Sequence, residues 1–422
     1  MAHLLMIESW VGGTGRIFPP AIGRLGHRYT FVTRNRDHYR DPRTREIHPA
    51  IEHADHVLSC DTNDVPALIE FLRAQHAILK FDGVVTICDY YIDTVAQVAQ
   101  ALALPQAFSA NVVMERRKDR VREAIERAGL PNPKFAVTAD WAQTREQARR
   151  IGYPLILKPT DLASSAFVRL VRDEVELCHA YDALEQFPRN FREQQRVPLV
   201  LLEEYLQGDE VSVEACTYDG ETTVIGITDK SLAGFPYFIE DGHMFPARLE
   251  AAQAQAAIAL VRGALAAVGH DHGISHTEVK LTADGPRVIE INPRPGGNYI
   301  VELIQRVTGI DLLDAQIELA LGRKPDLAPR ATGVSSAAIK FLVPPRGGRV
   351  DSVEGVDSLD ADPHLARWSL AAIAGSEVAE PIDNACYLGH VVAVDAQGLD
   401  ARAYAERALE RVRLHYAAPA AA

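Results

Sequence analysis

Cysteine and lysine are scarce in this chain, and long apolar runs are missing. Its five cysteines are scattered, odd in number and without a C-x-x-C pair, which argues against a disulfide framework. No stretch approaches the ~18 apolar residues of a membrane-spanning helix, and the N-terminus lacks the basic and apolar regions of a signal peptide. These absences predict a reduced, cytoplasmic protein.

Acidic residues outnumber basic ones, and the formal net charge is -13. Only eight of the 44 basic residues are lysines. This balance argues against a nucleic acid or an anionic membrane as the main partner, because both favour basic surfaces. The chain of 422 residues is long enough for two or three structural units. A homodimer is compatible with the composition.

Two common nucleotide-binding motifs are missing. No G-x-x-x-x-G-K-[ST] segment occurs, which excludes a P-loop. Residues 10–15 are rich in glycine, but their spacing is not the G-x-G-x-x-G of a dinucleotide site. We predict a tight turn from strand to helix here, with close approach of a small ligand to the backbone as the alternative.

Short apolar runs alternate with helical segments near the N-terminus, which predicts a parallel sheet covered by helices. The expected strands there are 4–7, 29–33, 56–60 and 83–88, and the expected helices are 65–76 and 91–104. The later chain is richer in strands. They are expected at 154–158, 166–171, 199–204, 210–218, 222–229, 335–342 and 389–394, with helices at 112–128, 250–268, 299–321 and 401–415.

The segment 275–292 has the most specific pattern in the chain. Glu290 and Asn292 alternate with apolar residues, so both side chains are expected on one face of a strand. The preceding strand carries Glu278 and is joined to it by a turn, so Glu278 could face Glu290. These hard oxygens suit Mg²⁺. A surface hairpin with solvated charges is the alternative for any one of them.

Two lysines are candidate anion ligands. Lys118 is expected at the start of a helix, where a cation and backbone N–H groups can meet phosphate oxygens, although a solvated basic turn would look the same. Lys158 ends an apolar strand and is followed by Pro159. A lysine that emerges from a buried strand requires an anion, and phosphate is the predicted one.

An apolar strand at 199–202 leads directly into Glu203, Glu204, Tyr205 and Leu206, and a short loop then reaches Glu210. Backbone groups at the end of such a strand can bind adenine, and a carboxylate can bind ribose hydroxyls.

In this order, the features resemble those of the ATP-grasp superfamily, whose members use ATP to join carboxylates to amines or other nucleophiles. The resemblance covers about residues 1–420. It implies that Lys118 and Lys158 hold ATP phosphates and that Arg294 stabilises the acyl-phosphate and tetrahedral states, which makes Lys158 and Arg294 the candidate catalytic residues. The implied nucleotide ligands also include Glu203, Glu204, Tyr205, Leu206, Glu210 and Lys230, and the implied ligands of two Mg²⁺ ions are Glu278, Glu290 and Asn292.

The chain departs from the family in its phosphate loop. Many members have a glycine-rich loop after the second lysine, whereas residues 161–167 contain no glycine. The hydroxyl and amide groups of Ser164 and Ser165 could hold phosphate instead, as in the amino-acid ligase branch.

The implied fold is α/β, with an α+β lid. It would comprise a Rossmann-like N-terminal domain (1–110), linker helices and a small lid subdomain (111–200), an ATP-grasp core with the metal site (201–330) and a C-terminal α/β subdomain (331–422).

The sequence gives fewer indications of the substrate site than of the nucleotide site. Arg294 with the amides of Gly296 and Gly297 would form a carboxylate pocket. Residues 236–246, with Glu240 and His243, are predicted as a loop over the substrate, or as a surface loop without contact. His276 could face the same cavity or have a structural role.

Among ATP-grasp enzymes the chain most resembles the L-amino acid ligases. The implied reaction joins an amino acid to an amine or a second amino acid, both small molecules, through an acyl phosphate, with release of ADP and phosphate. The alternatives are a bicarbonate-using carboxylase or carbamoyl-phosphate-type enzyme and an ATP-binding scaffold without catalysis.

Overall fold

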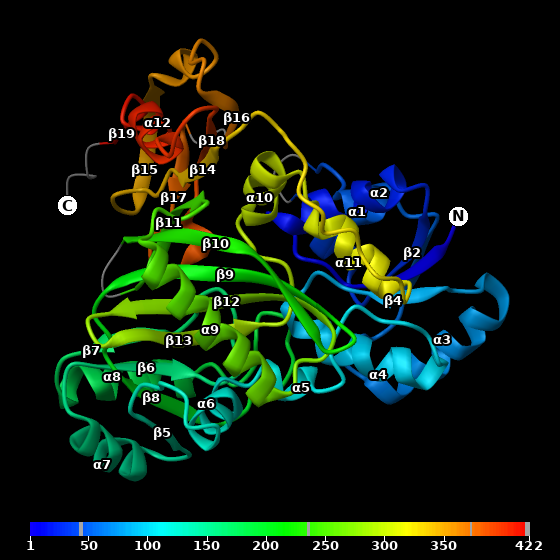
Figure 1. Cartoon of the computed structure of the whole chain (residues 1–422), viewed down its shortest axis with the longest axis horizontal. Coiled ribbons are helices and arrows are strands. Elements are labelled where there is room, and N and C mark those ends of the chain that lie inside the picture. The colour runs from blue at the N-terminus through cyan, green and yellow to red at the C-terminus, as the bar shows by residue number, and fades with distance from the viewer. Residues whose placement is uncertain (42–44, 234–236, 372–373, 418–422) are drawn as a thin grey trace.

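The N-terminal domain is built on a four-stranded parallel sheet, as predicted. In this computed structural model, which describes residues 1–41, 45–233, 237–371 and 374–417, its strand order is β3-β2-β1-β4 (Figure 1). The elements are β1 (His3–Ile7), α1 (Thr14–Arg24), β2 (Arg28–Thr33), η1 (Arg36–Tyr39), α2 (Pro49–Glu52), β3 (His56–Ser59), α3 (Val65–Leu79), β4 (Gly83–Val85), η2 (Asp89–Tyr91) and α4 (Ile92–Leu102).

The glycines after β1 form the predicted tight turn into α1. Gly13 has a φ of 49°, in the left-handed region that glycine tolerates. A Cβ at Gly15 would lie 1.9 Å from the Trp10 carbonyl oxygen, so no larger residue fits at that position. The turn therefore brings α1 directly onto the end of β1.

The lid is a four-stranded antiparallel sheet in the order β5-β8-β6-β7, with α7 and α8 packed on it. The side chains of Asp140 and Asp173 cap the N-termini of α7 and α8. Its elements, with the two helices that precede it, are α5 (Val112–Glu115), α6 (Lys118–Arg127), β5 (Phe135–Thr138), α7 (Trp141–Ile151), β6 (Leu155–Pro159), β7 (Arg169–Val171), α8 (Glu174–Glu185) and β8 (Val200–Glu204).

An eight-stranded antiparallel sheet forms the centre of the molecule, in the order β13-β12-β9-β10-β11-β14-β18-β16 (Figure 1). Asp219 and Gly220, both with positive φ, make the tight hairpin between β9 and β10. The elements of the core are β9 (Asp209–Tyr218), β10 (Glu221–Ala233), β11 (Ile239–Phe245), α9 (Ala251–Val268), β12 (Gly273–Thr282), β13 (Gly285–Asn292), α10 (Ile300–Thr308) and α11 (Leu312–Ala320).

The helix α9 covers this sheet. Among the described residues it is the one helix that is long and apolar enough, by length and composition, to cross a membrane. Its buried residues, including Leu260, Val261 and Leu265, pack in one cluster with Val279 and Val288 of β12 and β13. We therefore interpret α9 as a core helix.

The C-terminal region extends the central sheet and adds a small one. The strands β14, β16 and β18 join the eight-stranded sheet, while β15, β17 and β19 form a three-stranded sheet of their own. The bounds are β14 (Ser336–Phe341), β15 (Gly348–Glu354), η3 (Val356–Ser358), β16 (Leu365–Leu370), β17 (Ser376–Val378), η4 (Asn384–Cys386), β18 (Gly389–Asp395), α12 (Ala401–Leu409) and β19 (Arg413–Tyr416).

Three helices predicted as continuous are shorter or broken. The predicted helix 112–128 is interrupted at residues 116–117, so that α6 begins at Lys118. The predicted helix 299–321 breaks at Gly309, which has a φ of 72°, and Asp311 then caps α11. The predicted helix 401–415 ends at Leu409, and the following strand β19 pairs with β15.

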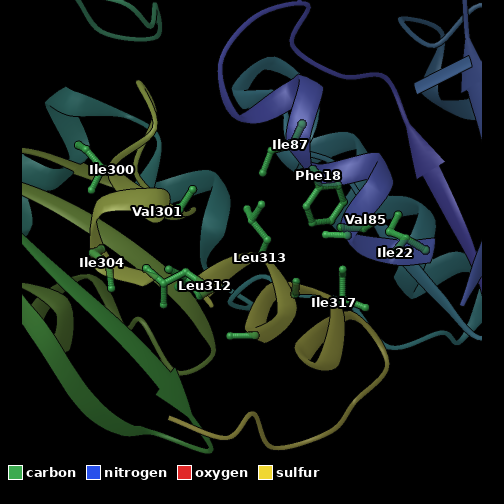
Figure 2. Close-up of a cluster of buried hydrophobic side chains, with 14 of the residues drawn as sticks. Phe18, Ile22, Val85, Ile87, Ile300, Val301, Ile304, Leu312, Leu313 and Ile317 are labelled. Carbon is green, nitrogen blue, oxygen red and sulfur yellow. The ribbon is translucent and has the colours of Figure 1, made fainter. Parts of the chain in front are cut away.

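An apolar cluster fixes the N-terminal domain to the core (Figure 2). Phe18 and Ile22 of α1 pack in it with Leu313 and Ile317 of α11, and all are buried. Ile300 at the start of α10 belongs to the same cluster. Burial of such side chains contributes about 1.5–3 kcal/mol each. The start of α10 therefore packs in the same cluster as α1, and the Thr14 hydroxyl of α1 donates to the Gly296 carbonyl oxygen in the preceding loop at 3.4 Å.

Candidate active site

A cavity between the lid and the central sheet collects most of the predicted nucleotide residues. Its apolar walls include Ile156, Leu206 and Ile289, which suit a flat ring system. The predicted site residues that line it are Lys118, Lys158, Ser165, Glu203, Glu204, Tyr205, Leu206, Glu210, Glu240, Glu278 and Glu290. They come from the lid, from α6 and from the central sheet, so the cavity depends on the packing of the lid against the core.

Lys158 lies at the lid side of this cavity and is 3% exposed. Its Nζ is 2.7 Å from Oε2 of Glu203, and Arg122 donates to the other oxygen of the same carboxylate. Burial lowers the pKa of Lys158, and the charge of Glu203 opposes that shift. Burial alone would raise the pKa of Glu203, but Arg122 and Lys158 lower it to about 2. The carboxylate of Glu203 thus holds Lys158, so adenine binding by Glu203 would use its backbone.

Lys118 is the first residue of α6, because the predicted helix is interrupted between α5 and α6. Its Nζ is 2.8 Å from Oε1 of Glu290 and donates to the Leu162 carbonyl oxygen at 2.6 Å. The ammonium therefore bridges the lid loop and the strand β13. Both lysines have carboxylate partners that a bound polyphosphate would share or displace.

The strands β12 and β13 form the predicted hairpin. Glu278 lies opposite Glu290, and His276 lies opposite Asn292. Two carboxylates and one amide oxygen suit a hard cation that keeps positions open for phosphate oxygens or water, so these residues fit Mg²⁺. Within the described residues, no three His, Cys, Asp or Glu side chains form a ready-made metal site. A metal here would thus share its coordination with the nucleotide.

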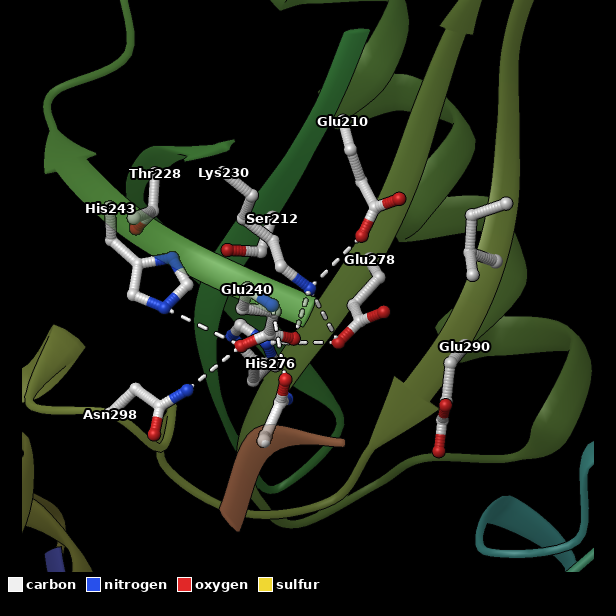
Figure 3. Close-up of polar contacts among 12 residues, drawn as sticks. Glu210, Ser212, Thr228, Lys230, Glu240, His243, His276, Glu278, Glu290 and Asn298 are labelled. Carbon is white, nitrogen blue, oxygen red and sulfur yellow. Dashed lines mark hydrogen bonds and ion pairs between the residues drawn. The ribbon is translucent and has the colours of Figure 1, made fainter. Parts of the chain in front are cut away.

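Lys230 is surrounded by three carboxylates (Figure 3). Its Nζ lies 3.1 Å from Glu210, 3.0 Å from Glu240 and 2.8 Å from Glu278. Burial alone would lower the pKa of Lys230, but the three carboxylates raise it well above its usual range. Burial alone would raise the pKa of Glu278, but Lys230 and His276 lower it to about 2. One ammonium therefore faces three carboxylates, and Lys280 shares one of them, since its Nζ lies 3.0 Å from Oε2 of Glu210.

His276 is held between two acids. Its Nδ1 is 2.9 Å from Oε1 and 3.0 Å from Oε2 of Glu214, and its Nε2 is 3.6 Å from Oε1 of Glu278. Burial alone would lower its pKa, but Glu214 and Glu278 raise the pKa of His276 to about 9. Both ring nitrogens are engaged, so His276 orients Glu278.

The predicted loop at 236–246 was wrong for residues 239–245. Pro236 lies outside the described residues, whereas 239–245 form β11, which pairs with β10 and β14. The pairing places Glu240 beside Lys230, and Nε2 of His243 is 3.5 Å from the Glu240 carboxylate (Figure 3). Glu240 therefore lines the cavity, whereas His243 is buried and does not line it.

Two residues beside Glu240 were missed from the sequence. Asn298 donates from Nδ2 to Oε2 of Glu240 at 2.9 Å, and the Tyr387 hydroxyl donates to the Glu240 carbonyl oxygen at 2.7 Å. Asn298 follows the predicted Gly296–Gly297 pair directly, and this position could have identified it. Nothing in the local sequence distinguishes Tyr387.

Arg294 lies in the loop after β13 and forms an ion pair with Asp89, with 2.7 Å between Nε and Oδ1. The adjacent Gly296 approaches the site closely, since a Cβ there would lie 3.2 Å from Nδ1 of His276. A Cβ at Gly297 would lie 3.9 Å from Nη1 of Arg294. Arg294, Gly296 and Gly297 are thus gathered next to the carboxylate cluster. Asp89 was missed, although a carboxylate at the end of a parallel strand is a typical site residue.

The loop at 161–167 adopts the left-handed backbone conformation without glycine. Ser164, Ser165 and Phe167 all have positive φ, at 61°, 55° and 60°. Non-glycine residues adopt this conformation at a cost, which the surroundings of a functional loop offset. Ser165 lines the cavity, whereas Ser164 does not.

Comparison with known proteins identifies the domains of the chain and its fold. The ATP-grasp domain model matches residues 151–302, the ATP-grasp N-terminal domain model matches 21–106, and the model of L-amino acid ligase C-terminal domain 2 matches 340–417. The crystal structure of L-amino acid ligase from Bacillus licheniformis superimposes with a TM-score of 0.80 over 99% of both chains, at 22% identity, which shows the fold.

Two relatives are similar in sequence. The uncharacterized protein y4rH of Sinorhizobium fredii is 29% identical, over 90% of this chain and 80% of its own length. Carnosine synthase 1 of Gallus gallus is 31% identical over 70% of this chain, but the match spans 34% of that enzyme. The chain therefore belongs to the ATP-grasp superfamily, and its C-terminal region is of the L-amino acid ligase type.

Proposed function

We propose that the protein is an ATP-dependent carboxylate–amine ligase that forms an amide bond between an amino acid and an amine or second amino acid, and releases ADP and phosphate. The observation that carries this proposal is the meeting of Lys118, Lys158, Glu278 and Glu290 in one cavity below the lid. Such a set suits the transfer of a phosphoryl group, in which catalysis is mainly positioning and charge stabilisation.

Each residue has a distinct role in this proposal. Lys118 and Lys158 bind phosphate oxygens and reduce the repulsion that an incoming carboxylate would meet. Mg²⁺, held by Glu278, Glu290 and Asn292, would neutralise further charge on the same oxygens. The carboxylate of the first substrate accepts the terminal phosphoryl group, and an amine then displaces phosphate from the acyl carbon. Arg294 stabilises the charge that develops on the acyl oxygens.

The carboxylates around Lys230 suggest how an amino acid would bind. Glu240 is ionised, and both Asn298 and His243 face its carboxylate. A substrate ammonium group is a suitable partner for this acid, while the guanidinium of Arg294 is suited to the carboxylate of the same molecule. The match to the L-amino acid ligase C-terminal domain supports this substrate class over bicarbonate.

The first test is nucleotide hydrolysis coupled to ligation. With ATP and Mg²⁺, we expect a panel of amino acid pairs to give equal amounts of ADP, phosphate and amide product, and negligible ADP without an amine. ADP formation that requires bicarbonate would favour the carboxylase alternative. Tight ATP binding without ADP release from any amino acid, amine or bicarbonate would favour the scaffold, and AMP with pyrophosphate would contradict the proposal.

A further inference from the structure

Asp89 is held from two sides at the end of the N-terminal sheet. It begins η2, just after β4, and its side chain is 9% exposed. Oδ1 accepts a hydrogen bond from Nε of Arg294 at 2.7 Å, and Oδ2 accepts one from Nε1 of Trp10 at 2.8 Å. Because both oxygens have a donor, the carboxylate has one defined orientation.

The same contacts define the orientation of Arg294. Its Nε binds Asp89, and its Nη1 donates to the Pro295 carbonyl oxygen at 2.9 Å. Two bonds from different edges fix the plane of a guanidinium group. Among the described residues Nη2 has no hydrogen-bond partner, so both of its N–H groups are open to a substrate oxygen.

The short helix η2 also contacts the lid. The Tyr90 carbonyl oxygen accepts from Nε2 of Gln194 at 2.9 Å, and the Tyr90 hydroxyl accepts from the backbone N–H of Ala163 at 3.3 Å. The guanidinium carbon of Arg192 lies 5.7 Å from the centroid of the Trp10 ring, and Arg192 donates to the Ser9 carbonyl oxygen. Residues 190–194 of the lid therefore pack over Trp10, one of the two residues that bind Asp89.

A second set of bonds fastens this lid segment to the N-terminal domain. Arg34 forms an ion pair of 2.6 Å with Glu193, and Nδ2 of Asn63 donates to the Arg192 carbonyl oxygen at 2.9 Å. The backbone of the segment, and not only its side chains, is thus bound to the domain that carries Asp89.

We propose that Asp89 is a positioning residue for ligation, which fixes the guanidinium of Arg294 in the orientation required by the substrate. Docking of lid residues 190–194 on Trp10 and Tyr90 completes this arrangement, so that Arg294 is fully oriented when the lid is closed. The inference rests on the proposed function, because it assigns Arg294 a substrate to act on.

The substitution Asp89→Asn tests this role, because it preserves size and removes the charge that strengthens the bond to Arg294. With the amino acid pair that gives the fastest ADP release, we expect kcat to fall about tenfold or more, the KM of the carboxylate substrate to rise, and the Kd of ATP to stay within about twofold. Asp93→Asn is the matched control, since Asp93 pairs with Arg116 at the same 2.7 Å and does not bind Arg294. It should retain normal kcat.

A double-mutant cycle separates positioning from a general structural effect. If Asp89 acts through Arg294, adding Asp89→Asn to Arg294→Lys should change kcat less than about threefold. Trp10→Phe, which keeps the ring and removes the N–H donor, should lower kcat in the same direction as Asp89→Asn. Unchanged kcat in Asp89→Asn, or losses that multiply in the double variant, would overturn the inference. An inactive wild-type protein would instead overturn the proposed function.

Discussion

Glu290→Ala is expected to lower kcat by about 10²–10³-fold while the protein remains folded. Loss of an electrostatic group that acts in the transition state typically costs ~3–4 kcal/mol. Glu290 faces Glu278 across the hairpin and binds Lys118 at 2.8 Å, so its removal affects both the proposed metal site and one phosphate ligand. The measurement is steady-state ADP release at saturating amino acids and Mg²⁺.

Asp284→Ala is the matched control for this substitution. Asp284 lies in the turn of the same hairpin, is exposed and does not line the cavity. We expect normal turnover and an unchanged melting temperature for this control. Turnover of Glu290→Ala within about tenfold of wild type would contradict the metal role. A lowered melting temperature with normal turnover would identify Glu290 as a structural acid.

Arg294→Lys is expected to lower turnover by roughly 10² while the affinity for ATP alone changes little. Lysine keeps the charge, but it cannot bind Asp89 through one nitrogen and present another nitrogen of the same rigid plane to the substrate. The loss corresponds to about one preorganised donor. ATP affinity should persist, because the cavity lined by Lys118, Lys158 and Glu210 does not include Arg294.

The informative comparison is between turnover and equilibrium ATP binding in the same variant. Arg287→Lys serves as the control, because the guanidinium of Arg287 contacts only turn carbonyl groups of the same hairpin among the described residues. Should Arg294→Lys bind ATP and turn over as well as wild type, Arg294 would have no chemical role.

Local sequence pattern was sufficient for most of the fold. The alternation of apolar runs and helices predicted the N-terminal parallel sheet, and the period of two in 275–292 predicted the face that Glu278 and Glu290 share. The misassigned elements have local reasons. Residues 236–246 were predicted as a loop because they contain Gly and Pro and mix aromatic residues with Glu240 and His243, whereas pairing on both sides makes 239–245 a central strand. The strand β19 was predicted as part of a helix, because its composition favours a helix and its partner β15 lies about 60 residues earlier.

The candidate site could be predicted only where its residues lie on one hairpin or at one strand end. The pairing of Arg294 with Asp89 joins residues 205 positions apart, and no local pattern encodes it. The same holds for Tyr387, which reaches Glu240 from the C-terminal region across 147 positions. Lys230 was predicted to bind the nucleotide. In the folded chain its ammonium group is surrounded by three carboxylates that come from separate strands.

The transfer of oxygen from substrate to phosphate tests the central claim most directly. In the proposed reaction, a carboxylate oxygen attacks the terminal phosphorus of ATP, and that oxygen leaves with phosphate when the amine attacks the acyl carbon. With an amino acid labelled with ¹⁸O in its carboxylate, we predict one ¹⁸O atom in each phosphate released, together with ADP and the amide, as measured by mass spectrometry. Unlabelled phosphate, or label found in AMP, would contradict the account.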